Sequence, residues 1–350
     1  MPRLGDYVKI KTGKLDENDS SENGQYPFFT CSVEPLKIDT YSYDCECVLV
    51  AGNGDLNVKY YNGKFDAYQR TYIIESKEKN ILSVPYLYCF LDGYVEELRK
   101  QSIGGVIKYI KLGNLTEAQI PLCSITEQNE IVENLNKVNT LITLRKQQLA
   151  KLDELVKARF IEMFGGVHDS KIYPYKAVKE LTDVVSGGTP SRDISEYWEE
   201  GTIPWVKTTE LQNNIVTEVE EYITEQGLSN SSAKIVPSGT VLIAMYGQGK
   251  TRGMTAYLGV EACTNQACAC ILPSAKINQT FLWQFFILSY DNLRDMAKGG
   301  NQPNLNGNMI KNYPILCPPR ELQEQFAAFV EQTDKSKYHG ESTYETEVAA

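Results

Sequence analysis

The phrase "QIPLCSITEQNEIVENL" at residues 119–135 has a second version later in the chain, "NYPILCPPRELQEQFAAFV" at residues 312–330. In each version a proline lies inside a short apolar run, and a cysteine and a loop follow. An acidic residue and a glutamine then lead into a segment with helical apolar spacing. This order predicts a strand, a loop and the start of a helix. The repetition indicates that the chain contains two related units.

Other segments repeat in the same order, with insertions in the loops of the second half. The matched pairs are "LGDYVKIKTG" (4–13) with "VKELTDVVSG" (178–187), "YPFF" with "IPWV", "VLVAGNG" with "VLIAMYG", "AYQRTYII" with "TNQACACI", "YLYCFL" with "FLWQFF", and "SIGG" (102–105) with "AKGG" (297–300). Because the order and the glycines agree as well as the apolar pattern, we interpret the chain as a tandem duplication.

Composition limits the classes of function. A length of 350 residues favours roughly two domains. The 45 acidic residues exceed the 35 Lys and Arg, and the formal charge of −10 argues against a polyanion-binding surface over the whole protein. Local basic clusters stay possible. No apolar run approaches the roughly 20 residues of a membrane helix, so we expect a soluble protein without a membrane partner.

The nine cysteines are an odd number and lie mostly in apolar, strand-like runs of a chain that shows no signal peptide. This pattern predicts reduced core thiols and a cytoplasmic protein. The cluster "CTNQACAC" lacks a fourth ligand at the spacing of a zinc site, and both histidines are distant in sequence. We therefore predict no metal site.

Each half is mostly strand-like, with turns such as "GNGD", "YNGK" and "SGGTPS", and with one amphipathic helix near 83–100 or 279–297. Between the halves, apolar residues with 4-3 spacing predict a coiled-coil-like helix that ends at "FGG" (164–166). Its seam consists of Ile131, Leu135, Val138, Ile142, Leu149, Leu152, Val156 and Met163, with Arg145 and Arg159 at two further positions.

The expected fold is α+β: two mostly β modules joined by a long coiled-coil-like helix, with a short second helix at the C-terminus. The predicted boundaries are 1–123 for the first module, 124–166 for the central helix, 167–318 for the second module, 319–338 for the short helix and 339–350 for a polar, disordered tail.

Three motifs together resemble the specificity (S) subunits of type I restriction-modification systems. They are the module openings "LGDYVKIKTG" and "LTDVVSGGTP", the closing phrases at residues 119–135 and 312–330, and "KQQLAKLDELVKARFIEMFG" at the end of the long helix. The resemblance covers nearly the whole chain. It implies two target-recognition domains that bind the halves of a split, asymmetric double-stranded DNA target, with paired helices that set the gap. It also implies partner subunits for adenine methylation (M) and restriction (R), without a cofactor in the S subunit. The short C-terminal helix departs from the family, whose second long helix pairs with the first.

Candidate DNA-binding residues follow from amide, hydroxyl and cationic side chains near predicted turns, which suit base edges and phosphates. In the first module they are Asn53, Lys59, Lys64, Arg70, Gln101 and Lys108. In the second they are Lys207, Thr208, Gln248, Lys250, Thr251, Arg252, Asn301, Gln302 and Asn304.

Three patterns imitate enzymes. "AMYGQGKT" nearly matches a phosphate-binding loop, but a turn and a strand, not a helix, are expected after it. Asp66 with Glu75 and Lys77 imitates a nuclease site without a counterpart in the second half, and "CPPR" (317–320) lacks the amide and the aromatic residue of an adenine methyltransferase. The sequence thus predicts a subunit without catalytic residues. The alternative is a truncated scaffold that binds methyltransferase subunits without productive DNA recognition.

Overall fold

The computed structural model describes residues 1–247, 249–297 and 304–348, with side chains described as far as residue 337. The chain divides into two compact units, Met1–Arg145 and Lys146–Ala350, and the boundary lies within the long helix α5 (Ile125–Phe164). Within the described residues, no helix combines the length and the apolar character needed to cross a bilayer.

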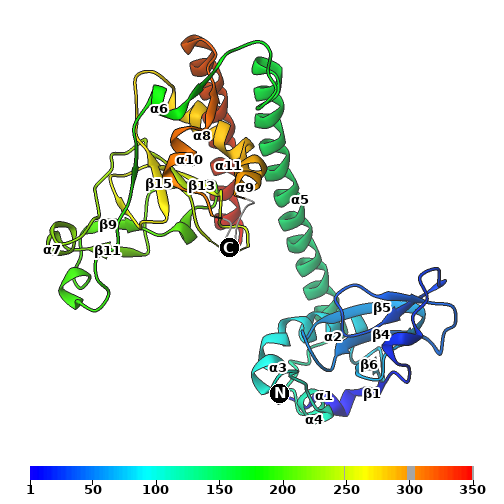
Figure 1. Ribbon diagram of the computed structural model, residues 1–350. Helices are drawn as coiled ribbons and strands as arrows, with labels where there is room; N and C mark the ends of the chain where they lie inside the picture. The colour runs from blue at the N-terminus through cyan, green and yellow to red at the C-terminus, as the bar shows by residue number, and fades with distance from the viewer. Residues whose placement is uncertain (248, 298–303, 349–350) are drawn as a thin grey trace. The chain divides into compact units, whose positions relative to one another are not determined.

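The first unit is built on a six-stranded sheet with the order β1-β6-β4-β5-β2-β3 (Figure 1). The strands are β1 (Val8–Thr12), β2 (Tyr26–Phe29), β3 (Leu36–Ile38), β4 (Tyr43–Ala51), β5 (Val58–Ala67) and β6 (Thr71–Ser76). The helices are α1 (Leu4–Tyr7), η1 (Glu17–Asp19), α2 (Val84–Gly93), α3 (Val95–Gln101), α4 (Leu112–Thr116) and the first half of α5. Val48 and Val50 of β4 form a core with Leu87 and Leu91 of α2, so that burial of these apolar side chains holds helix and sheet together.

The second unit contains a five-stranded sheet, β10-β13-β12-β15-β8, a three-stranded sheet, β11-β9-β14, and the pair β16-β7. Its strands are β7 (Tyr175–Ala177), β8 (Val184–Ser186), β9 (Ile203–Val206), β10 (Asn214–Val216), β11 (Glu221–Ile223), β12 (Val241–Ala244), β13 (Thr255–Leu258), β14 (Cys263–Thr264), β15 (Cys268–Ile271) and β16 (Pro314–Leu316). Its helices are α6 (Val178–Leu181), η2 (Ser195–Tyr197), η3 (Thr208–Glu210), α7 (Glu225–Ser229), α8 (Gln279–Leu288), α9 (Tyr290–Met296), α10 (Gly307–Lys311) and α11 (Arg320–Val348).

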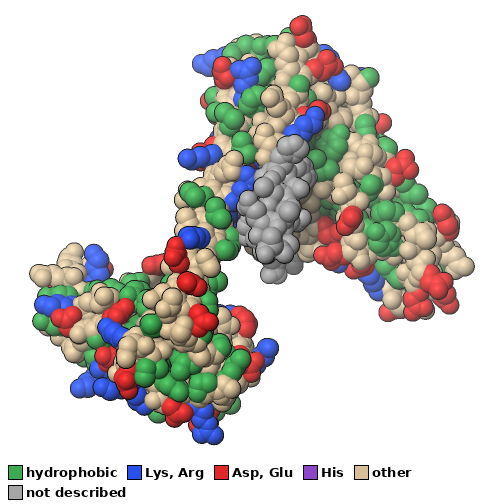
Figure 2. Space-filling model, turned by 180° about the vertical axis from the view of Figure 1, so that it is seen from behind, with side chains coloured by type: hydrophobic (Ala, Val, Ile, Leu, Met, Phe, Trp, Pro, Cys, Tyr) green, Lys and Arg blue, Asp and Glu red, His purple; other side chains and the backbone are tan. Residues whose placement is uncertain are grey.

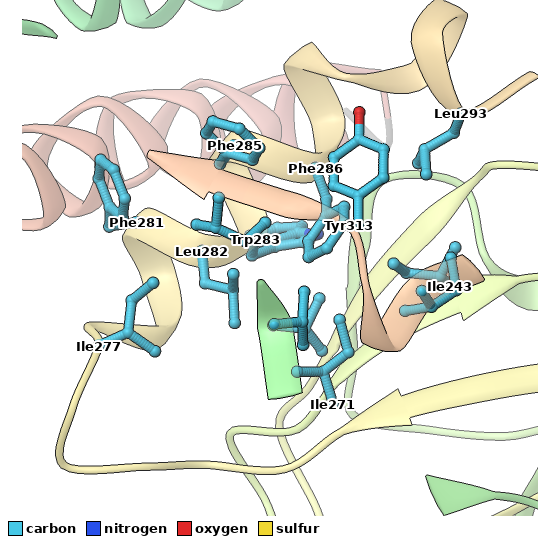
Figure 3. Close-up of a cluster of buried hydrophobic side chains, with 14 of the residues drawn as sticks. Ile243, Ile271, Ile277, Phe281, Leu282, Trp283, Phe285, Phe286, Leu293 and Tyr313 are labelled. Carbon is cyan, nitrogen blue, oxygen red and sulfur yellow. The ribbon is translucent and has the colours of Figure 1, made fainter. Parts of the chain in front are cut away.

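The core of the second unit lies where α8 packs on the sheet (Figure 3). Phe281, Phe285 and Phe286 of α8 are fully buried in one cluster with Ile243 of β12 and Ile271 of β15. The mostly apolar sequence "FLWQFFIL" forms a helix here because nearly every side of it is covered by protein.

Equivalent strands of the two units pair in the same register, which confirms the predicted duplication. In the first unit, β4 and β6 pair at Val48↔Ile74 and β1 and β6 at Ile10↔Ile74, both antiparallel, and β2 and β5 pair in parallel at Phe28↔Asp66. The equivalent pairs of the second unit, in the same order and directions, are Val241↔Ile271, Val184↔Ile271 and Trp205↔Cys263. The matched sequence segments therefore occupy matched positions in the sheets.

The repeated phrase of residues 119–135 and 312–330 joins each module to a long helix through a buried glutamine. Gln128 accepts a hydrogen bond from Ser83 N at 2.9 Å and donates to the Cys123 carbonyl at 2.9 Å. Gln323 accepts from Asn278 N at 2.9 Å and donates to the Pro318 carbonyl at 2.8 Å. Since Ser83 caps α2 and Asn278 caps α8, each glutamine connects the start of a module helix to the start of α5 or α11.

The single amphipathic helix predicted in each module is in fact two consecutive helices. In the first module Gly93 ends α2, and Tyr94 N donates to the carbonyls of Phe90 and Leu91 before α3 begins. In the second module Ser289 separates α8 from α9, and its hydroxyl donates to the Phe285 carbonyl at 2.7 Å. The Ser289 hydroxyl competes with backbone N–H groups for this carbonyl, which favours the end of the helix. The spacing of apolar residues in the sequence gives no sign of this competition.

The long central helix is confirmed, but its predicted seam is wrong over the last turns. Phe160 and Phe164, not Arg159 and Met163, are fully buried there. Both rings contact Phe281 of α8 and Phe326 of α11. Packing against two helices that lie in the same unit rotates the buried stripe from the strict 4-3 spacing to i, i+4 spacing.

Helix α11 extends to Val348, past residue 338 where the sequence predicted that it would end in a polar tail. Polar composition argues against a buried segment, but it does not prevent a helix that is already formed from gaining one backbone hydrogen bond for each added residue. Within the second unit α11 lies along the last turns of α5, and Lys337 Nζ forms an ion pair with Asp153 Oδ1 at 2.7 Å.

Candidate nucleic-acid interface

Loops from distant parts of the sequence meet at one end of the sheet in each module, and we call this group of loops the loop edge. In the first module it comprises residues 13–15, 29–32, 52–57, 67–70 and 108–110. In the second it comprises residues 187–189, 206–210, 245–247, 249–254, 264–267 and 304–306.

Four backbone hydrogen bonds hold the loop edge together, and each recurs in both modules. In the first module the bonds run from Gly52 N to Arg70 O (2.8 Å), from Tyr68 N to Phe29 O (2.9 Å), from Lys14 N to Ala67 O (3.2 Å) and from Ile110 N to Gly52 O (2.9 Å). The equivalent bonds of the second module, in the same order, run from Met245 N to Ala267 O (2.8 Å), from Asn265 N to Val206 O (3.1 Å), from Gly188 N to Thr264 O (2.9 Å) and from Leu305 N to Met245 O (3.0 Å). The two loop edges thus share one backbone frame.

Gly13 and Gly187 occupy the same place in this frame, and both must be glycine for steric reasons. A Cβ on Gly13 would lie 2.0 Å from the Ala67 carbonyl oxygen, and one on Gly187 would lie 2.1 Å from Thr264 Oγ1. Contacts this short would force the loops apart. The glycines that mark the repeat in sequence therefore allow close approach of loops in the structure.

In the first module, three of the predicted residues lie on the loop edge. Asn53 pairs with Tyr109 in an isolated β-bridge, Gly54 N donates to the Lys108 carbonyl at 2.9 Å, and Arg70 is exposed next to them in the frame. The structure therefore brings Asn53, Arg70 and Lys108 together from three separate loops.

Lys59 and Lys64 of β5 have different surroundings. Lys59 donates to the Asn57 side chain, and burial lowers the pKa of its ammonium group. Lys64 is exposed opposite Asp44 at the start of β4, the end away from residues 52–57. It lies over the Tyr41 ring at 4.6 Å, and hydrogen bonding to Tyr41 raises its pKa. Of these two lysines, Lys59 lies beside the loop edge and Lys64 does not.

Gln101 makes contacts that favour a structural role. Its amide nitrogen donates to Glu97 Oε1 at 3.1 Å and to the Tyr94 hydroxyl at 3.3 Å, and its oxygen accepts from Asn114 Nδ2 at 3.2 Å. These bonds tie α3 to α4, so the side chain is already occupied within the module.

In the second module, Lys207 and Thr208 lie on the loop edge after β9. Lys207 Nζ donates to Glu220 at 2.6 Å and to Glu221 at 3.0 Å, and these hydrogen bonds raise its pKa. The charge of Lys207 is thereby partly compensated by two carboxylates, which makes it a poorer phosphate ligand than the sequence suggested. Thr208 begins η3 and is half-buried.

Lys250, Thr251 and Arg252 lie in the loop between β12 and β13, which α9 holds in place. The Tyr290 hydroxyl donates to the Lys250 carbonyl at 2.7 Å, and Arg294 Nη1 donates to the Arg252 carbonyl at 3.1 Å. Lys250 itself is exposed. The backbone of this loop is thus fixed while its cationic side chain faces solvent.

Asn304 is exposed at the loop edge, directly before the bonded Leu305. The other three predicted residues, Gln248, Asn301 and Gln302, lie outside the described residues.

Two exposed glutamines on the loop edge, Gln69 and Gln266, were not among the sequence candidates. The signal that could have identified them was their identity in the matched segments "AYQRTYII" and "TNQACACI".

The patterns that imitate enzymes have structural explanations. The loop that resembles a phosphate-binding loop continues into strand β13. The buried Asp66 carboxylate accepts from Ser42 Oγ at 2.6 Å and from Ala67 N at 2.9 Å, whereas Glu75 pairs with Lys11. Lys77 Nζ donates to the Asp6 carbonyl at 2.8 Å. The three groups of the nuclease-like pattern thus have separate partners.

The cysteines of "CTNQACAC" are buried in the sheets of the second module, as predicted. Burial raises the pKa of Cys263 and Cys270 to about 11, and raises that of Cys268 well above its ordinary value. Thr264 Oγ1 lies 3.3 Å from Cys270 Sγ. Neutral thiols in this environment act as small apolar side chains.

Charge divides the surface of the second module. Figure 2 shows Asp and Glu gathered at the end that carries α7 and β11, where Glu196, Glu199, Glu200 and Glu225 line a shallow depression. Because carboxylates repel phosphate, this end is unsuited to DNA. The loop edge with Lys250 is the better candidate for a nucleic-acid interface.

Comparison with known proteins identifies relatives of the chain. The relatives include the specificity subunit of the type I restriction enzyme EcoDI from Escherichia coli, with 38% identity over 154 residues, which are 44% of this chain and 34% of that protein. They also include the specificity subunits of EcoR124I/EcoR124II from Escherichia coli (24% identity over 280 residues, 75% of this chain and 66% of that protein) and of MjaIX from Methanocaldococcus jannaschii (29% over 191 residues, 51% and 43%). The chain spans from about a third to about two thirds of the length of these relatives.

Solved structures show the same fold. The crystal structure of a type I restriction-modification system S subunit from M. genitalium superposes with a TM-score of 0.60 at 17% identity, covering 99% of this chain and 91% of that one. A second structure, which concerns complex assembly and conformational transition of the type I R-M system, superposes with a TM-score of 0.57 at 16% identity, covering 99% of this chain and 93% of that one.

The family described as "Type I restriction modification DNA specificity domain" matches residues 1–154 and 173–347. These two matches correspond to the two units of the structure and together cover most of the chain. The protein therefore belongs to the family of type I restriction-modification DNA specificity domains.

Proposed function

We propose that the chain is a DNA-sequence-specificity subunit without catalytic residues, and that its two modules bind the two halves of a split DNA target. The observation that carries this proposal is the pair of loop edges, which share four backbone hydrogen bonds but differ in most side chains. A common frame with different side chains is what two readers of different sequences require.

The complete target should be asymmetric. At equivalent frame positions the first module has Arg70 where the second has Ala267, and Asn53 where the second has Tyr246. Arginine forms hydrogen bonds to base edges that alanine cannot form, and the amide of asparagine offers other hydrogen-bonding groups than the hydroxyl of tyrosine, so the two modules prefer different base pairs.

The proposed partners are double-stranded DNA, adenine methyltransferase subunits and, through the complex, restriction subunits in the cytoplasm. Part of α5 offers a surface for a protein partner. Ile131, Leu135, Val138, Leu141 and Leu144 lie on this helix with 39% to 55% of each residue exposed. Burial of these apolar side chains by another subunit would be favourable by the hydrophobic effect.

The direct test is to co-express the chain with a matching methyltransferase subunit and to map N6-methyladenine in the host genome by long-read sequencing. We expect one bipartite, asymmetric motif with a fixed gap. If a stable complex forms but no motif is methylated, the chain is a scaffold that binds the methyltransferase without productive DNA recognition, and the proposal is wrong.

A further inference from the structure

Gln69 and Gln266 occupy the same position in the two loop edges. Gln69 lies between Tyr68, whose N donates to the Phe29 carbonyl, and Arg70, whose carbonyl accepts from Gly52 N. Gln266 lies between Asn265 and Ala267, which make the equivalent bonds to Val206 and Met245. Since the backbone on both sides of each glutamine is held by equivalent hydrogen bonds, the two side chains project from the same position of the shared backbone frame.

Both glutamines are exposed although their neighbours differ. Tyr68 and Arg70 flank the first, whereas Asn265 and Ala267 flank the second. If these exposed side chains were only part of the solvated surface, packing would not require the same residue type at both positions, because the neighbouring residues differ. The same side chain on the same frame can instead contact the same chemical group of a ligand in both modules.

The second glutamine is held in one orientation. The Thr189 hydroxyl donates to Gln266 Oε1. An amide oxygen has two lone pairs, so Oε1 can accept a second hydrogen bond while Nε2 stays available as a donor. In the first module Leu15 stands where the second has Thr189, and Gln69 N donates to its carbonyl at 2.9 Å. Leucine has no hydroxyl, so it cannot hold Gln69 in this way.

An amide that presents a donor and an acceptor side by side matches adenine in the major groove, where N7 accepts and the N6 amino group donates. A phosphate offers acceptors alone and would use only half of the amide. A cationic side chain such as Lys250, exposed on the loop edge of the second module, serves phosphate better.

We propose that Gln69 and Gln266 are specificity-determining residues that each form a bidentate pair with an adenine, at corresponding positions of the two half-sites. The inference rests on the proposed function, because it assumes that the loop edges face DNA. It predicts that the two half-sites, although different overall, share an A·T pair at the position nearest these side chains.

The test uses the full chain co-expressed with its methyltransferase subunit and the variants Gln69→Ala and Gln266→Ala. Each should reduce discrimination at one A·T pair by about 10- to 100-fold, in its own half-site alone, and leave the rest of the motif unchanged. The readout is the methylated fraction at every near-cognate site by long-read sequencing. Matched controls are Gln119→Ala and Gln226→Ala, exposed glutamines of the same modules away from the loop edge, which should keep the wild-type motif.

Two further variants separate base contact from other roles. Gln266→Glu keeps the shape of the side chain but loses the donor, so the preference at that position should move from adenine toward cytosine, whose N4 amino group donates to a carboxylate. Thr189→Val should weaken discrimination at the same base pair, and Thr189→Ser should restore it.

The possible outcomes separate the two proposals. A wild-type motif that both alanine variants leave unchanged overturns the inference and keeps the proposed function. A uniform loss of methylation over all sites, with no change of preference, assigns the glutamines to phosphate and also overturns it. Absence of any motif with the wild-type chain contradicts the proposed function itself.

Discussion

At the scale of single residues, two buried glutamines account for the phrase that occurs twice in the sequence. Gln128 is fully buried and Gln323 is 4% exposed, and both ends of each amide are hydrogen-bonded. Removing such a side chain leaves several backbone groups of the module helix and the loop without partners in a site that water does not reach.

Gln323→Ala should destabilise the second unit by about 2–4 kcal/mol, since at least two buried polar groups lose their partner. All 3 tryptophans, Trp198, Trp205 and Trp283, lie in this unit, so urea unfolding followed by their fluorescence reports on it alone. The exposed Gln325→Ala is the matched control and should stay near the wild-type midpoint.

Gln128→Ala should leave the tryptophan transition in place and lower the stability of the first unit, measured by circular dichroism. Equal tryptophan midpoints for Gln323→Ala and wild type would contradict the structural role.

The buried thiols predict a pH dependence of stability. Burial raises the pKa of Cys270 from 9.0 to about 11, so the folded state keeps a proton that the unfolded chain loses. Stability from this group is complete below about pH 9 and is lost as the pH rises toward 11. The free energy of unfolding by tryptophan fluorescence should therefore fall between pH 9 and 11, and less steeply in Cys270→Ala. Cys31→Ala, in the first module, should keep the wild-type slope, and an unaltered slope in Cys270→Ala would argue against this origin.

At the scale of elements, helix α5 is the segment in which the two compact units meet in sequence. If it sets the gap between half-sites, one heptad inserted after Leu144 should lengthen the methylated gap by up to about three base pairs. Seven residues add about 10.5 Å to a helix, and DNA advances about 3.4 Å for each base pair. Both half-site sequences should persist, because a heptad returns the helix to within about 20° of its starting face.

The insertion needs a control for simple disruption. Four added residues rotate the helix by a different angle and should reduce methylation more than the heptad does. An unchanged gap with full activity in the heptad variant would show that the helix does not measure the distance between half-sites.

At the scale of the whole molecule, the two modules share strand registers and loop-edge bonds but belong to separate compact units. Exchange of residues 174–312 for the equivalent module of a relative should change one half of the methylated motif and keep the other. The mapping of N6-methyladenine checks this directly. A change in both halves would contradict independent recognition by the two modules.

The sequence by itself determined the large features: the duplication, the mostly β modules, the long helix and the family resemblance. These follow from patterns of apolar residues and glycines that repeat along the chain, and such patterns report local structure and burial. It also predicted Asn53, Arg70 and Lys108 as DNA-binding candidates in turn-rich segments, and the structure places these three residues together on the loop edge.

Only the tertiary structure decided the rest, because it depends on partners distant in sequence. Phe160 and Phe164 replaced the predicted seam residues once α8 and α11 packed against them. Lys207 and Gln101 proved to be engaged by side chains of their own module. The equivalence of Gln69 and Gln266 in space depends on hydrogen bonds between loops whose pairing no local pattern specifies.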